Sequence, residues 1–173
     1  MVYDSKKLRE HMFFEESVNI REAIQRVTKE IFPLIRKKFS ELEEKNTELL
    51  KADHSLAFSF NRLKKEFEGL SNKFELLWVP AVVKCLETSD CQKPFNGFTI
   101  IRASHIRQRK GLLELRNMCD AYVMEESWEQ EKKQLCFQAY QLETAYLKYL
   151  NFMESTLIPM LKQLSQSTQI NES

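Results

Sequence analysis

Residues 56–81, LAFSFNRLKKEFEGLSNKFELLWVPA, decide the fold. Their apolar residues recur in alternating steps of four and three, which is typical of the buried face of an amphipathic helix in a bundle. This stripe predicts a long helix with an N-cap at Thr47. Its members are Leu56, Phe60, Leu63, Phe67, Leu70, Phe74, Leu77 and Ala81.

Three further stretches carry the same helical period. Only residues 87–96, which lead to Gly97, have the composition of a long loop. Four amphipathic helices with one longer connection in the middle predict an all-α, antiparallel up-and-down four-helix bundle. The stripes are Ile20, Ile24, Val27, Ile31, Leu34, Ile35 and Leu42; then Ile101, His105, Leu112, Leu115, Cys119 and Tyr122; then Leu135, Ala139, Leu142, Tyr146, Tyr149, Met153, Met160 and Leu164.

The composition excludes several classes of protein. The chain has 173 residues, which is the length of one domain, and its 3 glycines and 4 prolines are too few for a turn-rich β fold. A net charge of +1 gives no reason to expect nucleic acid or an acidic membrane as a partner. Because there is no glycine-rich phosphate loop, zinc-binding HExxH or nucleophile elbow, we expect no enzymatic activity.

The polar and apolar stretches of the sequence predict the cellular compartment, the state of the cysteines and the domain boundaries. The chain lacks an apolar run of membrane-spanning length, and its first ten residues are polar, so we expect a cytoplasmic protein. All four cysteines (Cys85, Cys91, Cys119 and Cys136) are then expected to be thiols. We expect an N-terminal arm or short helix over 1–13, the bundle over 14–164 and a flexible tail over 165–173.

Two segments in the second and fourth helices repeat one arrangement. Phe74-Glu75-Leu76-Leu77-Trp78-Val79-Pro80 and Met153-Glu154-Ser155-Thr156-Leu157-Ile158-Pro159 each have an apolar residue, Glu directly after it, an apolar pair and then Pro. Because proline removes a backbone donor and repels the carbonyl four residues back, each segment predicts a kink or a helix end at a matching place.

With these motifs the chain resembles the hemerythrin-like domains, in particular the C-terminal domain of the di-iron proteins that repair iron–sulfur clusters. Leu77-Trp78-Val79-Pro80 and Leu157-Ile158-Pro159 are similar to the motifs that follow the ligands of the family's second and fourth helices. The family's third helix is matched in order, and Ile20-Arg21-Glu22 resembles its first. The resemblance covers residues 14–164 with few identical positions, and the third-helix matches are Ser104-His105, Leu115-Arg116 and Asp120-Ala121-Tyr122.

The resemblance implies where iron ligands belong, and most of those positions have lost them. His105 is the one imidazole that remains, while the first helix offers Glu16 or Ser17. The second helix has Leu70 and Phe74, and the fourth has Tyr149 and Met153, where His and Glu are expected. We therefore expect a degenerate site and no cofactor. Because Leu70, Phe74, His105, Tyr149 and Met153 all lie on the apolar stripes, we expect them to converge in the bundle interior.

The sequence leaves three interpretations of the function. The first is a non-catalytic binding, regulatory or structural module, in which His105 is a buried histidine hydrogen-bonded to Tyr149 or to a carbonyl. The second is a metal-binding protein of iron–sulfur repair or of the oxygen or nitric-oxide response, holding iron through His105, Glu16 and Tyr149. The third is an unrelated helical adaptor. For a protein partner, the candidate surfaces are Phe95 with Phe98 and the basic pair Arg107 and Arg109.

Overall fold

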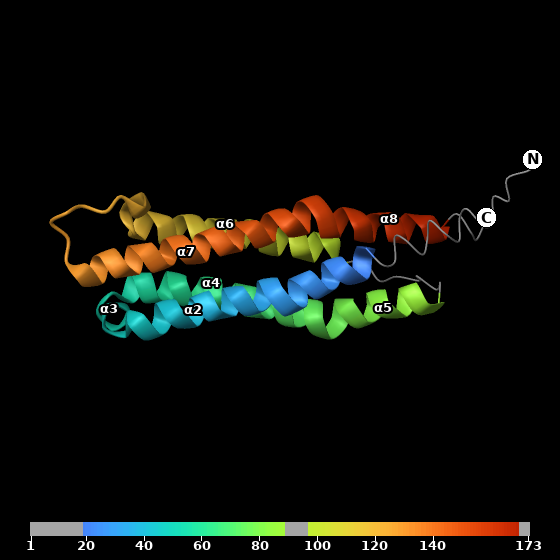
Figure 1. Cartoon of the computed structure of the whole chain (residues 1–173), viewed down its shortest axis with the longest axis horizontal. Coiled ribbons are helices and arrows are strands. Elements are labelled where there is room, and N and C mark those ends of the chain that lie inside the picture. The colour runs from blue at the N-terminus through green and yellow to red at the C-terminus, as the bar shows by residue number, and fades with distance from the viewer. Residues whose placement is uncertain (1–18, 89–96, 170–173) are drawn as a thin grey trace, which may run out of the picture.

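The computed structural model describes residues 19–88 and 97–169, and within these ranges it is all-α, without a strand. The helices lie lengthwise beside one another as a bundle (Figure 1). Short α3 and the α6–α7 connection lie at one end, and α5 and α8 extend to the other. No helix of the described ranges combines the length and hydrophobicity needed to cross a membrane.

The helices follow one another with few breaks. Residues 19–26 are α-helical and continue into a π-helical turn, η1. The elements are η1 (Val27–Ile31), α2 (Phe32–Lys45), α3 (Thr47–Ala52), α4 (His54–Lys73), the π-turn η2 (Phe74–Trp78), α5 (Val79–Thr88), α6 (Phe98–Met118), the 3-10 turn η3 (Asp120–Tyr122), α7 (Gln130–Phe152), the π-turn η4 (Met153–Leu157) and α8 (Ile158–Gln169).

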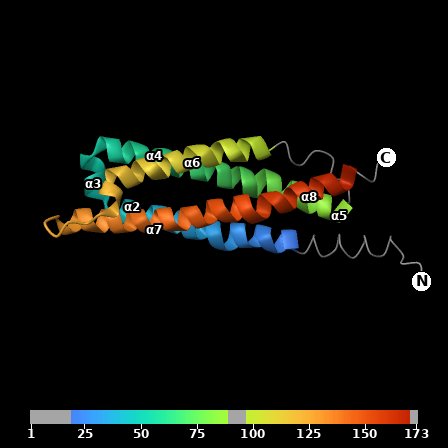
Figure 2. The same ribbon diagram turned by 90° about the horizontal axis from the view of Figure 1, so that it is seen from above.

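The core runs along the axis of the bundle, where α4 packs against α6 and α2 packs against α7 (Figure 2). Its centre is aromatic. Phe32 lies edge-to-face against Phe67, Phe74 and Tyr149, with ring centroids 5.6, 5.7 and 5.6 Å away. Edge-to-face pairs of this kind stabilise a core by about 0.5–1.5 kcal/mol beyond the area they bury. Phe32 thus joins three helical segments at one level of the bundle.

Each of the three π-turns ends just before a proline. In η1, η2 and η4 the N–H directly before that proline donates to the carbonyl five residues back: Phe32 to Val27, Val79 to Phe74 and Ile158 to Met153. Pro33, Pro80 and Pro159 follow. A proline ring clashes with the carbonyl four residues earlier in a regular α-helix, and a wider π-turn relieves that clash. The helices therefore continue through these prolines instead of ending there.

The extra residue in each π-turn changes which residues face the core beyond it. Leu34 is 46% exposed and Leu77 is 61% exposed, so the prediction that both lie on buried stripes is wrong. A π-turn inserts one residue into the helical period, so every later position moves round the helix. Val82 and Leu161 are buried, while Ala81 and Met160 are only half-buried.

Two predicted helix boundaries also differ. The second helix is not continuous from Thr47, because α3 ends before Asp53, whose carboxylate accepts the Leu56 N–H at 2.9 Å and caps α4. The third helix ends at Met118. Beyond it Asp120, Ala121 and Tyr122 all have positive φ, a conformation incompatible with a right-handed helix.

Some of the domain and loop boundaries expected from the sequence fall within the described residues. α8 continues to Gln169, past the bundle boundary expected at residue 164. The expected arm over 1–13 and most of the expected loop over 87–96 lie outside the described residues, although α5 extends to Thr88.

The cysteines fall into two groups. Cys119 and Cys136 are buried thiols, and burial raises the pKa of both. Cys85 is disulfide-bonded, so the prediction of four thiols is wrong. Disulfides persist in oxidising compartments, and the cysteines therefore give no support to a cytoplasmic location.

Candidate functional site

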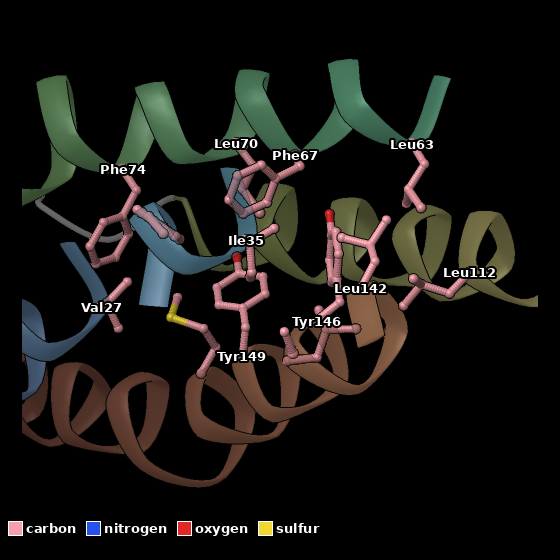
Figure 3. Close-up of a cluster of buried hydrophobic side chains, with 14 of the residues drawn as sticks. Val27, Ile35, Leu63, Phe67, Leu70, Phe74, Leu112, Leu142, Tyr146 and Tyr149 are labelled. Carbon is pink, nitrogen blue, oxygen red and sulfur yellow. The ribbon is translucent and has the colours of Figure 1, made fainter. Parts of the chain in front are cut away.

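The five positions that correspond to ligand positions in the resemblance lie in the interior. Leu70, Phe74, His105, Tyr149 and Met153 are each at most 5% exposed. In Figure 3, Leu70 and Phe74 project from one side of the core and Tyr149 from the other, with Val27 beside them. Phe32 contacts both Phe74 and Tyr149, so the space between the helices is filled by carbon side chains.

His105 connects this apolar layer to the surface through hydrogen bonds. Its Nδ1 lies 3.2 Å from Glu154 Oε1, and its Nε2 lies 3.4 Å from the Tyr149 hydroxyl. Because a carboxylate only accepts, Nδ1 carries the proton, and Nε2 accepts from the Tyr149 O–H. Arg109 donates to the other oxygen of Glu154 at 2.9 Å. The histidine thus uses both ring nitrogens inside the protein.

Burial determines the charge of these groups. Desolvation lowers the pKa of His105 below 6.5, and the nearby Glu154 carboxylate only partly opposes this effect. Burial raises the pKa of the Tyr149 hydroxyl, which therefore remains a donor. A neutral imidazole with a protonated phenol is the pair that one hydrogen bond can satisfy.

Two other buried polar atoms are not satisfied. The Tyr146 hydroxyl and Gln108 Oε1 are buried, and neither has a hydrogen-bond partner among the described residues. The Gln108 amide nitrogen does donate to Ser104 at 3.3 Å. An unsatisfied buried polar atom costs about 1–3 kcal/mol, so these atoms weaken the core where Tyr149 and His105 do not.

The residues present do not fit a di-iron centre. No cluster of three or more His, Cys, Asp and Glu side chains capable of holding a metal occurs in the described part of the chain. The layer supplies one imidazole and one phenol, and its other members are hydrocarbon or thioether groups, whereas di-iron sites need several carboxylates and imidazoles. Glu16 and Ser17 lie outside the described residues.

In the structure, three of the four residues predicted to form partner surfaces make contacts within the chain. Phe98 is half-buried and packs against the core, while Phe95 lies outside the described residues. Arg107 pairs with Glu66 at 2.6 Å, and Arg109 pairs with Glu154. These two arginines are therefore largely neutralised by acids on neighbouring helices, and only Arg107 lies beside a groove.

That groove lies on the α4–α6 seam and has a volume of about 480 Å³. Sequence reasoning missed it, because its α4 residues alternate with the buried stripe and look like an ordinary solvated face. The signal that could have found it is Gly69, a glycine inside a helix. Its lining includes Phe58, Arg62, Lys65, Glu66, Gly69, Leu70, Lys73, Ile100, Ser104 and Arg107.

Comparisons with known proteins assign no family. No protein-family model, curated protein or solved structure matches the chain.

Proposed function

We propose that the chain is a non-catalytic four-helix bundle of hemerythrin-like architecture, whose di-iron site has degenerated and which acts as a binding module. The observation that carries the proposal is the content of the interior layer. Leu70, Phe74 and Met153 occupy it with apolar side chains, and each is buried. Burying such a side chain contributes about 1.5–3 kcal/mol, so the layer serves stability.

The three π-turns support the same origin for this layer. π-turns are rare in helices and are concentrated at functional sites. Here Val27, Phe74 and Met153 each begin one, and each is buried. We interpret them as backbone geometry that served ligand placement in an ancestor and is now retained by the prolines and the packing.

The His105 network argues for a structural role of the one surviving imidazole. Nε2 is the nitrogen that would face a metal in the core, and it accepts from Tyr149 instead. Nδ1 is held by Glu154. A histidine with both nitrogens engaged contributes fold specificity and orientation, and it offers no lone pair to a cofactor.

Metal analysis tests this proposal. The protein is purified from cells grown with added iron, and its metal content and visible absorption spectrum are measured. We expect iron far below one atom per chain and no charge-transfer band. About two irons per chain, as in di-iron bundles, would overturn the proposal.

A His105→Ala variant serves as the matched control. If wild type retains iron and the variant does not, the degenerate-site proposal is wrong, and the protein binds iron at the atypical site of His105, Glu16 and Tyr149. Under our proposal the variant has the same metal content as wild type and differs only in its melting temperature.

A further inference from the structure

Gly69 in α4 is a glycine that the fold itself does not require. A Cβ added at Gly69 meets nothing within 4 Å, whereas a Cβ at Gly111 in α6 would lie 3.1 Å from Leu63 Cδ1. Gly111 is thus explained by the close packing of α6 on α4. Glycine inside a helix costs about 1 kcal/mol relative to alanine, and at Gly69 no internal contact offsets that cost.

The α4 residues of the groove lie in two rows. Side chains four positions apart are stacked on one face of a helix, so Lys65, Gly69 and Lys73 form an outer row. Arg62 and Glu66 belong to the inner row, which faces α6 and makes its ion pairs there. Arg62 pairs with Glu114, and Glu66 accepts from Arg107 and from Ser104.

The ion pairs leave the outer row as the charged edge of the groove. The charges of Arg62 and Arg107 are balanced by Glu114 and Glu66. In contrast, neither Lys65 nor Lys73 makes an ion pair within the described residues, and both are exposed. Among the described residues, the edge of the groove therefore carries two lysines without an ion-pair partner, one on either side of Gly69.

The same groove also exposes apolar surface. Phe58 is 66% exposed at one end, and Ile100 on α6 is 50% exposed. Exposed apolar groups next to a hollow are typical of docking surfaces. Charge and hydrophobicity together specify an occupant with carboxylates along one edge and apolar side chains on its inner face.

We infer that the α4–α6 groove binds an acidic amphipathic helix of a partner protein, with the partner backbone or a small side chain approaching over Gly69. Lys65 and Lys73 are eight residues apart, which is about 12 Å along a helix. Matching carboxylates on a partner helix lying along α4 are then about two turns apart, with Leu or Phe between them facing Phe58 and Ile100. This inference rests on the proposed binding role.

The test uses two synthetic helical peptides of about 18 residues, a length that supports helix formation. One carries Glu two turns apart with Leu and Phe between them, and the other has Lys in place of each Glu. Binding to the full chain is measured by fluorescence anisotropy. We expect the Glu peptide to bind and the Lys peptide to bind at least about tenfold more weakly.

Substitutions in and away from the groove locate the binding. Gly69→Leu fills the hollow, and the double variant Lys65→Glu with Lys73→Glu reverses the charge of the groove edge. We expect each to weaken binding of the Glu peptide by at least about tenfold. Lys148→Glu reverses one charge at an exposed position of α7 that does not line the groove. It is compared with the single variant Lys65→Glu, which makes the same charge change, and it should bind like wild type. Gly69→Ala, which fits the open space, serves if Gly69→Leu does not fold, as judged by its melting curve.

Several results would overturn the inference. Equal binding of both peptides, or unchanged binding by a folded Gly69→Leu, removes the groove as the site. If inorganic phosphate competes with the peptide as well as unlabelled peptide does, the site recognises a small anion. If the chain dimerises and Gly69→Leu abolishes the dimer, the occupant is a second copy. Iron content, measured separately, decides the degenerate-site proposal whatever the peptide result.

Discussion

The apolar layer at the π-turns and the groove between α4 and α6 differ in one respect. Contacts within the chain explain the residues of the layer, but they do not explain those of the groove. In the layer, Phe32, Phe74 and Tyr149 pack edge-to-face, and His105 finds a partner for each ring nitrogen. In the groove, a Cβ added at Gly69 would meet nothing within 4 Å, and Lys65 makes no ion pair with any residue that the structure describes. The comparison teaches that packing and hydrogen bonds within the chain account for the interior layer, whereas the groove has features that the fold does not explain.

The largest expected effect is the difference in stability lost when one residue of each region is replaced by alanine. Phe74→Ala creates a cavity in the apolar layer and should lower the unfolding free energy by about 3–5 kcal/mol. Lys73→Ala, one residue earlier but on the groove edge, should change it by less than about 0.5 kcal/mol. Chemical denaturation of both variants measures the difference. Similar losses for the two would show that the groove edge is part of the core.

The next largest effect is a difference in stability between Phe variants of two buried tyrosines of α7. Tyr149→Phe leaves His105 Nε2 without its donor, so we expect a loss of about 1–3 kcal/mol. Tyr146→Phe removes a hydroxyl that has no partner, so we expect no loss or a gain. Urea unfolding curves of the two variants test this. A loss at Tyr146 as large as that at Tyr149 would mean that its hydroxyl is hydrogen-bonded in solution.

The two α-helical glycines of the α4–α6 seam should also differ. Gly69→Ala should raise the unfolding free energy by about 1 kcal/mol, because alanine is the better helix former and the site is open. Gly111→Ala should raise it less or lower it, since buried Leu63 must shift. Thermal unfolding of both variants gives the comparison. A larger gain at Gly111 would contradict the packing described for α4 and α6.

The smallest expected effect is a pH dependence from His105. Because burial lowers its pKa below 6.5 in the folded protein, the unfolded chain binds more protons below that pH. Its contribution to stability is therefore complete above pH 6.5 and declines as the pH falls toward the lowered pKa. Unfolding free energies of wild type and His105→Phe between pH 7.5 and about pH 5 test the sign. A difference between the two proteins that does not change with pH would contradict it.

The sequence predicted the helical class, and its core stripes hold as far as the π-turns. Leu56 through Phe74 and Leu135 through Met153 follow the buried period, although Leu77 and Leu34 do not. Periodicity alone cannot place an inserted residue. An apolar residue six positions before a proline, at Val27, Phe74 and Met153, marks all three π-turns, whereas the repeated motif indicates a kink or a helix end only at Phe74 and Met153.

The site could be predicted only in part, for a different reason. Burial of His105, Tyr149 and Met153 follows from their place on the stripes. The groove depends on which surface charges find partners across helices: within residues 19–88 and 97–169, Arg107 pairs with Glu66 and Lys65 forms no ion pair. Such pairing is set by how the helices pack against one another, and the hydrophobic period of each helix does not show which residues then face each other.

Our central proposal is that the interior layer is a degenerate di-iron site that binds no iron. Its most direct test is thermal unfolding of wild type under anaerobic conditions, with excess ferrous iron and with a chelator. We predict the same melting temperature in both, because a layer without a metal site gains nothing from iron. A site filled at a hundredfold excess over its Kd would stabilise the fold by about 2.7 kcal/mol. A rise in melting temperature with iron that is lost in His105→Ala would contradict the account.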